Sequence, residues 1–381
     1  MLLSSPAAAA GADPLWYFDQ LGVQAVHDAG ITGEGVTIAV FDGKFNPDLV
    51  TFADADIQIR DLDGCAAEST DPTVAAHGSS VVSLLVGNGT STSGVGPKGI
   101  APETTILYYN TLDGECKDDS AFAESVEDAL AQGADIISMS GGFTAVTPDR
   151  RESQYDAVAE ALRAGVPVVM GLPNGDAPMA ATLDSANGVV HVSAVDAAGQ
   201  IQLSMTDEPL VDENVEVAAP GLDVAGVKEA AGTGGWGYAA WSGNSAATPL
   251  VAGVLALAKQ KWPDATASQL IQSLIRNAGD DADDLAWTDT VGYGIVDAPA
   301  MIATDPSEYP DENPLFVDDH EPSYDDSFPA PTPTTEPAPA GQEGTFWWLA
   351  GGGAVLVLAV VIAIVTVRSK RRNQQGAEHG I

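Results

Sequence analysis

The chain has 381 residues, with 54 Asp and Glu against 15 Lys and Arg, and a formal net charge of −39. This excess of negative charge argues against nucleic acids and anionic surfaces as partners, since both would be repelled. Hydrophobic residues make up 45% of the chain, which is enough to build one large folded domain.

The N-terminal twelve residues are rich in alanine and resemble the end of a signal peptide with an Ala-x-Ala cleavage region. The basic start and most of the apolar part of such a peptide are missing. We therefore expect residues 1–12 to be a signal-peptide remnant and the true translation start to lie upstream of Met1.

Apolar runs of strand length alternate with segments of helical periodicity between residues 13 and 304. This alternation predicts an α/β fold, a three-layer sandwich with a mostly parallel sheet between helices. The predicted strands are 35–41, 104–110, 134–139, 166–170 and 189–195. The predicted helices are 78–87, 120–132, 152–164, 245–260 and 266–277.

The first predicted strand is a β-branched run that ends in a carboxylate, Asp42, followed by Gly43. Open α/β sheets place their functional sites at the carboxyl ends of central strands, so Asp42 is a candidate functional group. Taken alone, this position suits a metal ligand, a ribose ligand or a cap for the next turn equally well.

His77 is the best-placed histidine for catalysis among the five in the chain. It stands at the start of a predicted apolar helix, and Gly78 beside it would let another chain segment approach closely. A lone histidine of this kind is more often structural than catalytic. The other four fit packed or surface positions or lie in the C-terminal region: His27, His191, His320 and His379.

Ser245 follows a Gly-Asn turn at the start of the helix predicted at 245–260. Free backbone N–H groups at a helix N-terminus can hold a developing negative charge on a neighbouring oxygen. Pro249 falls within about the first turn, where its missing N–H costs little. The alternative is that Ser245 only caps the helix.

The motifs around these residues resemble the subtilisin-like serine peptidases, or subtilases, over residues 15–303. The order Asp42, His77, Ser245 is also that of the subtilisin catalytic triad. The matching blocks lie at residues 31–43, 77–87, 99–102, 133–142, 166–175, 217–221, 243–250 and 292–297.

This resemblance implies a serine endopeptidase acting on protein or peptide substrates. Ser245 would be the nucleophile, His77 its base and Asp42 the group that orients the base. The side-chain amide of Asn174 would complete the oxyanion hole; without the resemblance it would be a loop residue supporting a turn. Ser140, Gly141 and Gly142 would border the S1 pocket. Without the resemblance, these residues would be only the end of a strand and the turn that follows it.

Three segments depart from the usual family pattern, and the serine segment reads Gly243-Asn-Ser-Ala-Ala-Thr-Pro-Leu250 where Gly-Thr-Ser-Met-Ala-Ala-Pro-His is common. Gly43 stands where Thr or Ser usually follows the catalytic Asp, and Asn244 stands where Thr usually precedes the serine. Pro173 lies in the lead to Asn174, which is usually rich in Asn. None of these changes removes a group that carries a proton or charge, so they bear on efficiency and pocket shape.

The resemblance implies no required cofactor and no catalytic metal. Structural Ca²⁺ is common in the family, but the sequence identifies no ligands for it here. The two cysteines, Cys65 and Cys116, are predicted to pair in an oxidising exterior and to brace the rim of the cleft.

The composition changes beyond residue 304. Residues 305–345 are acidic and rich in proline, which predicts a disordered linker. Residues 346–367 are uncharged and long enough for one transmembrane helix, with basic residues after it. These features predict a single-pass type I protein of the cell membrane with an extracellular catalytic domain and a cytoplasmic tail at 368–381.

The order of these segments is similar to that of mycosins, the subtilases of actinobacterial type VII secretion systems. A membrane secretion complex is therefore a candidate partner. The similarity to mycosins also leaves a second hypothesis open, in which the chain is a structural subunit of such a complex and its proteolytic activity is secondary.

Overall fold

The computed structural model describes residues 13–62, 65–92, 94–111, 121–140, 148–175, 183, 186–203, 208–230, 235–279 and 285–316. The chain divides into two units, Met1–Ala330 and Pro331–Ile381, and all described residues lie in the first.

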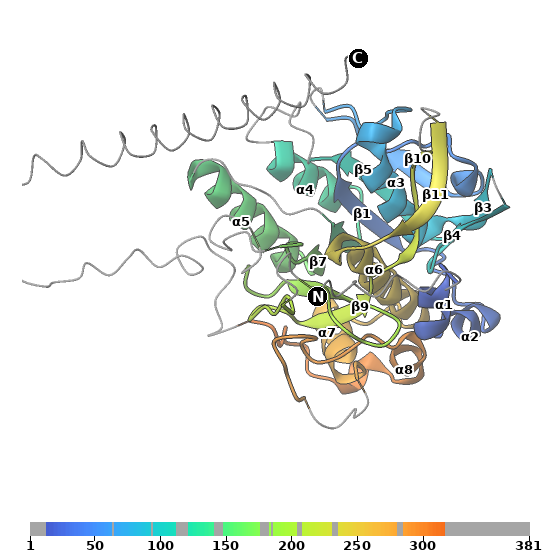
Figure 1. Ribbon diagram of the computed structural model, residues 1–381. Coiled ribbons are helices and arrows are strands. Elements are labelled where there is room, and N and C mark those ends of the chain that lie inside the picture. Colours follow the sequence, from blue (N-terminus) through green and yellow to red (C-terminus); the bar gives the residue numbers. More distant parts are fainter. Residues whose placement is uncertain are drawn as a thin grey trace, which may run out of the picture. The chain divides into compact units, whose positions relative to one another are not determined.

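A seven-stranded sheet with the order β2-β5-β1-β6-β7-β8-β9 runs through this unit (Figure 1). Every strand pair in it is parallel, which confirms the predicted parallel sheet. The five strands predicted from sequence are all present. The seven strands are β1 (Thr37–Asp42), β2 (Asp56–Ile59), β5 (Thr105–Asn110), β6 (Ile136–Met139), β7 (Val168–Gly171), β8 (Val190–Val195) and β9 (Val217–Pro220).

Strand β1 is buried on both faces because helices cover the sheet on both sides. Its side chains alternate between two hydrophobic cores, with Ile38 and Val40 in one and Ala39 and Phe41 in the other. The first core also contains the apolar faces of two helices, and the second those of two others, so the fold has three layers (Figure 1). These helices are α3 (Pro72–Val86) and α6 (Asn244–Lys261) on the first face, and α4 (Ala121–Ala131) and α5 (Pro148–Arg163) on the second.

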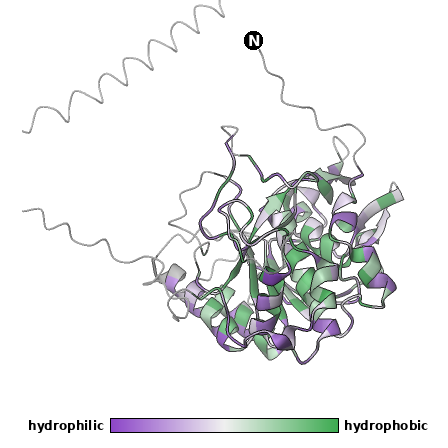
Figure 2. Cartoon of the chain, turned by 90° about the horizontal axis from the view of Figure 1, so that it is seen from below, coloured by the Kyte–Doolittle hydropathy of each residue, from purple (hydrophilic) through white to green (hydrophobic). Residues whose placement is uncertain are grey.

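The distribution of hydropathy follows these layers. Figure 2 shows hydrophobic residues along the central strands and the inner sides of the helices, and hydrophilic residues on outward turns. Helix α6 is buried from Asn244 to Ala258, which explains why its sequence is small and apolar on all sides.

Helix α3 begins six residues before the predicted start at residue 78. Asp71 caps it by accepting a hydrogen bond from the backbone N–H of Thr73, and Pro72 occupies the first helical position. His77 therefore lies in the second turn of α3, and not at its first residue. The Asp-Pro pair was the signal for this start.

Residues 16–28 form two short helices, α1 (Trp16–Gln20) and α2 (Val23–Asp28). The break is at Gly22, whose φ of 63° favours glycine. A Cβ atom at this position would also lie 2.6 Å from Pro299 in α8 (Ala298–Ala303). Close packing against α8 thus fixes the break.

Two hairpins are additions to the predicted elements: β3 (Asn88–Ser91) with β4 (Gly94–Lys98), and β10 (Val224–Ala230) with β11 (Gly235–Trp241). Hairpin β10–β11 packs against α3 beside the sheet (Figure 1). Its second strand contains two glycines, which weaken the strand pattern in the sequence.

The predicted linker begins at residue 305, whereas residues 305–316 pack against the folded unit. They include the short helix η4 (Pro306–Glu308), and Leu315 is buried in the first core. The amide of Asn313 donates to the backbone carbonyl of Gly188 at 2.9 Å. Local caps and the burial of Pro306 and Leu315 hold this segment in place despite its acidic composition.

The helix η4 packs against α7 (Ala267–Arg276), the last helix predicted for the domain. Helix α7 begins with a capping box between Thr266 and Gln269.

Among the described residues, no helix is both long and apolar enough to cross a bilayer. The transmembrane helix predicted at 346–367 lies outside the described residues, as do residues 1–12 and 368–381.

Candidate active site

Asp42 ends β1 at the point where the strand order reverses, with β5 on one side and β6 on the other. The residue is fully buried, and its backbone carbonyl accepts a hydrogen bond from Thr111 N–H at 2.8 Å. The prediction that a strand-end carboxylate lies at the centre of the sheet is confirmed.

The buried carboxylate of Asp42 contacts the ring of His77. Asp42 Oδ1 lies 2.8 Å from His77 Nδ1 and accepts a second hydrogen bond from Gly43 N–H at 2.7 Å. The His77 side chain is 44% exposed, so the far side of its ring is open to solvent. The negative charge of Asp42 raises the pKa of His77, against the opposing effect of burial.

Gly78 allows α3 to approach the end of β1. A Cβ atom at Gly78 would lie 2.1 Å from the Tyr108 hydroxyl and 2.7 Å from the backbone carbonyl of Lys44. The Tyr108 hydroxyl in turn donates to the carbonyl of Gly43 at 2.7 Å. Any larger residue would push α3, and His77 with it, away from Asp42.

Ser245 is the second residue of α6 and is 7% exposed. Gly243 is the N-cap of this helix and makes no side-chain cap, so the helix-cap alternative for Ser245 does not describe the structure. As one of the first residues of the helix, Ser245 has a backbone N–H without an intrahelical acceptor.

Asn174, on the loop after β7, lies beside this helix N-terminus. Its Oδ1 accepts a hydrogen bond from Asn244 N–H at 2.7 Å. A Cβ atom at Gly243 would be 3.1 Å from Asn174 Oδ1 and 3.2 Å from Nδ2. Glycine at position 243, two residues before Ser245, thus leaves room for the Asn174 amide.

Trp241 links the His77 region to the Ser245 region, and the sequence analysis did not single it out. Its ring meets the His77 ring edge-on, with centroids 5.6 Å apart and an interplanar angle of 84°. Trp241 ends β11, four residues before Ser245, and α3 packs against α6. The elements that carry Asp42, His77, Asn174 and Ser245 therefore meet at the carboxyl ends of the central strands.

Comparison with known proteins decides the family. The model of the subtilase family, Peptidase S8, matches residues 33–294. This chain belongs to the subtilase family. Its homologues are serine-type endopeptidases, and the chain is of that enzyme class.

Three relatives illustrate the extent of the likeness. The thermostable alkaline protease of Halalkalibacterium halodurans is 30% identical over 269 residues, which are 69% of this chain and 67% of that protein. The minor extracellular protease Epr of Bacillus subtilis is 29% identical over 293 residues, which are 76% of this chain but only 42% of Epr. A solved protease from Pseudoalteromonas arctica has a TM-score of 0.59 and 25% identity, covering 76% of this chain and 97% of that structure.

Other predicted site residues of the subtilase are placed as follows. Ser140 follows the end of β6 and is buried, and its hydroxyl has no hydrogen-bond partner among the described residues. Gly141 and Gly142, predicted beside it, lie outside the described residues. Cys65 is disulfide-bonded, and its predicted partner Cys116 lies outside the described residues.

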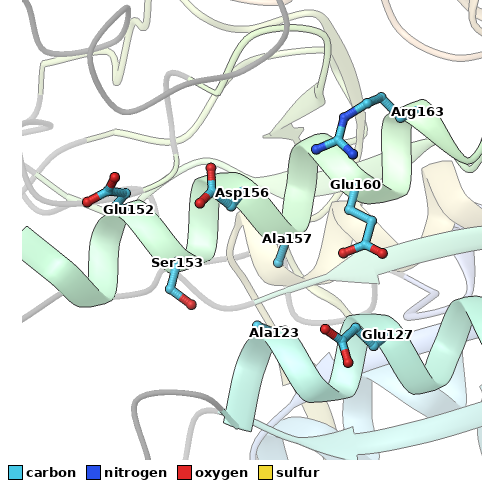
Figure 3. A pocket seen from close by; sticks show the side chains of 8 residues that line it. All are labelled: Ala123, Glu127, Glu152, Ser153, Asp156, Ala157, Glu160 and Arg163. Atoms are coloured by element: carbon cyan, nitrogen blue, oxygen red, sulfur yellow. The ribbon is translucent and has the colours of Figure 1, made fainter.

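The described part of the chain contains no group of three or more His, Cys, Asp or Glu side chains arranged to hold a metal ion. An acidic pocket lies between α4 and α5, lined by Glu127, Glu152, Asp156 and Glu160 among others (Figure 3). It contains none of the predicted catalytic residues.

Two further histidines are structural. His27 Nε2 lies 2.8 Å from the backbone carbonyl of Ile100, and His191 Nε2 lies 3.3 Å from that of Leu183. His191 is 3% exposed in β8, and burial lowers its pKa to about 4. His320 and His379 lie outside the described residues.

The buried His191 predicts that acid destabilises the fold. Its folded pKa lies below the unfolded value of 6.5, so stability is retained above pH 6.5 and lost as pH falls toward 4. The loss should reach about 3 kcal/mol in the free energy of unfolding. Urea unfolding at pH 8 and pH 4.5 should therefore differ less in His191→Gln than in the parent, with both proteins in a Ser245→Ala background to prevent self-digestion. Equal pH dependence in the two proteins would contradict the assignment.

Proposed function

We propose that this subtilase hydrolyses peptide bonds with Asp42, His77 and Ser245 as its catalytic triad. The observation that carries the proposal is the 2.8 Å contact between the buried Asp42 carboxylate and His77 Nδ1. It fixes the tautomer in which His77 Nδ1 carries hydrogen and Nε2 is free to accept a proton.

The reaction begins when Ser245 Oγ attacks the carbonyl carbon of the scissile bond. His77 Nε2 takes the hydroxyl proton, and the charge of Asp42 stabilises the resulting imidazolium. The same proton then passes to the leaving amine, which departs and leaves an acyl group on Ser245. Water, deprotonated by His77, hydrolyses this ester and restores the serine.

The tetrahedral oxyanion would be held by Asn174 Nδ2 and the backbone N–H of Ser245. Support comes from the orientation of the Asn174 amide, because its oxygen is already bound to Asn244 N–H. Among the described residues, Asn174 Nδ2 has no hydrogen-bond acceptor, and the residue is exposed. The Ser245 N–H lies at the positive end of α6, which also favours a negative oxygen.

Asn174→Ala is therefore expected to lower kcat by about 10²–10³, the loss known for the corresponding donor of subtilisin, with little change in KM. Hydrolysis of a chromogenic peptide gives both constants. Asn313→Ala, which removes the amide bonded to the Gly188 carbonyl before β8, serves as the control and should keep wild-type kcat. A kcat unchanged in Asn174→Ala would remove Asn174 from the oxyanion hole.

The substrate would be an extended peptide segment that lies as an added strand beside Ser140, Gly141 and Gly142. Main-chain hydrogen bonds suit a protein or peptide chain of varied sequence. The buried Ser140 at the end of β6 supports this placement, because β6 adjoins β1 and therefore Asp42.

The experiment that tests the function is labelling of the purified full-length chain with a fluorophosphonate probe, beside a peptide hydrolysis assay. Such probes phosphonylate an activated serine with loss of fluoride, so labelling and hydrolysis together support the proposal. A wild-type chain that shows neither would overturn it.

We also propose that the catalytic unit is tethered to the outer face of the cell membrane, on the strength of the apolar run 346–367 and the basic residues after it. Protease digestion of intact cells should remove the catalytic unit and leave a small membrane-bound fragment. Recovery of the whole chain in the soluble fraction would refute the tether. No described feature favours the structural-subunit alternative.

A further inference from the structure

Residue 244 is one place where this chain departs from the usual serine motif, and its side chain makes three hydrogen bonds. Asn244 is the first residue of α6 and is 4% exposed. A buried amide with unsatisfied atoms would be costly, so the partners of Asn244 show what its side chain is for.

Each polar atom of the Asn244 side chain has a partner. Its Nδ2 donates to the backbone carbonyls of Leu172 at 2.9 Å and of Pro173 at 3.1 Å. Its Oδ1 accepts from Ala194 N–H on β8 at 2.8 Å. The side chain therefore connects the loop after β7, strand β8 and helix α6.

The loop held in this way is the one that carries Asn174. Leu172 and Pro173 directly precede it, and the backbone N–H of Asn244 binds Asn174 Oδ1 at 2.7 Å. Backbone and side chain of one residue thus fix both the path of the loop and the orientation of the Asn174 amide.

We infer that Asn244 is a positioning residue, which holds Asn174 Nδ2 at the oxyanion site beside the N–H of Ser245. This inference rests on the proposed peptidase function and assigns a role to a residue that departs from the usual family motif. Asn244 itself does not touch the substrate. It acts by fixing the loop to the same helix end that carries the nucleophile.

Threonine could not replace these contacts. Its single hydroxyl has one hydrogen to donate, whereas the two loop carbonyls require two donors and Ala194 N–H requires an acceptor at the same time. The Pro173 carbonyl is part of this set, so the Gly-Leu-Pro-Asn lead and Asn244 form one matched arrangement.

The test is a double-mutant cycle in the full-length chain, with Asn244→Thr and Asn244→Ala each combined with Asn174→Ala. In the parent, each change at 244 should lower kcat about 10- to 100-fold with KM nearly unchanged, because a shift of about 1 Å in a catalytic donor costs this much. In the Asn174→Ala background, the same change should lower kcat by less than about threefold, since the group being positioned is already absent.

Asn277→Ala is the matched control, because it removes a buried amide of the same kind at the end of α7. It should lower stability without lowering kcat of the folded enzyme. Equal losses of kcat at 244 in both backgrounds would overturn the inference, as would wild-type kcat in Asn244→Thr. The unmodified chain is labelled with fluorophosphonate in parallel: if labelling fails, the proposed function fails, and if labelling succeeds but the cycle is additive, only the role of Asn244 fails.

Discussion

Replacing Ser245 with alanine is expected to abolish peptide hydrolysis, with a fall in kcat of about 10⁵–10⁶. In subtilisin, loss of the catalytic serine alone lowers kcat by about 2 × 10⁶, and the remaining rate comes from the oxyanion hole and substrate binding. In this chain the Asn174 amide lies at the helix N-terminus that carries Ser245, and the proposed mechanism assigns the Asp42–His77 pair as the base for Ser245. Fluorophosphonate labelling should disappear together with hydrolysis.

The stability of Ser245→Ala distinguishes a nucleophile from a structural serine. The Ser245 side chain makes no cap hydrogen bond, so the melting temperature should change little. Ser273→Ala, a buried serine in α7, is the control and should keep both labelling and kcat. Residual labelling of Ser245→Ala at the wild-type rate would show that another residue is the nucleophile.

The sequence was sufficient to predict the central strands and the residues at their ends. Asp42 follows the apolar run from Ile38 to Phe41, and such runs are buried between two layers of helices. The positions of Ser245 and Asn174 came from motif order, and the structure brings both to the same helix end. These features are local in sequence, which is why they could be predicted.

What could not be predicted depends on contacts between distant segments. The partners of Asn244 are 50 to 72 residues away along the chain, so no pattern near residue 244 indicates them. The edge-on contact of Trp241 with His77 depends on the β10–β11 hairpin, whose glycines mask its strand character. Residues 305–316 were expected to be linker because their composition is acidic, yet the buried side chains of Pro306 and Leu315 and local caps hold them in place.

Replacing Asp42 with asparagine should lower kcat by about 10⁴ while leaving the site nearly intact in shape. Asparagine can keep one acceptor for Gly43 N–H, but its amide group would then compete to donate to His77 Nδ1. A donor at that position favours the tautomer that carries hydrogen on Nε2, which cannot accept the proton of Ser245. Asp135→Asn is the control, because this carboxylate binds Thr37 N–H at the opposite end of the same strand, and kcat should be unchanged.

The pH dependence gives the same substitution a second readout. The charge of Asp42 raises the pKa of His77, so the rate should increase with pH as His77 loses its proton, and the midpoint should lie above the ordinary histidine value of about 6.5. Without that charge the pKa falls, and the acid limb of kcat/KM in Asp42→Asn should move to lower pH while the plateau drops. The same linkage means that the ion pair stabilises the fold below pH 6.5 and that this contribution is lost as pH rises through the folded pKa of His77. An acid limb at the same pH in both proteins would show that the titrating base is not the histidine paired with Asp42.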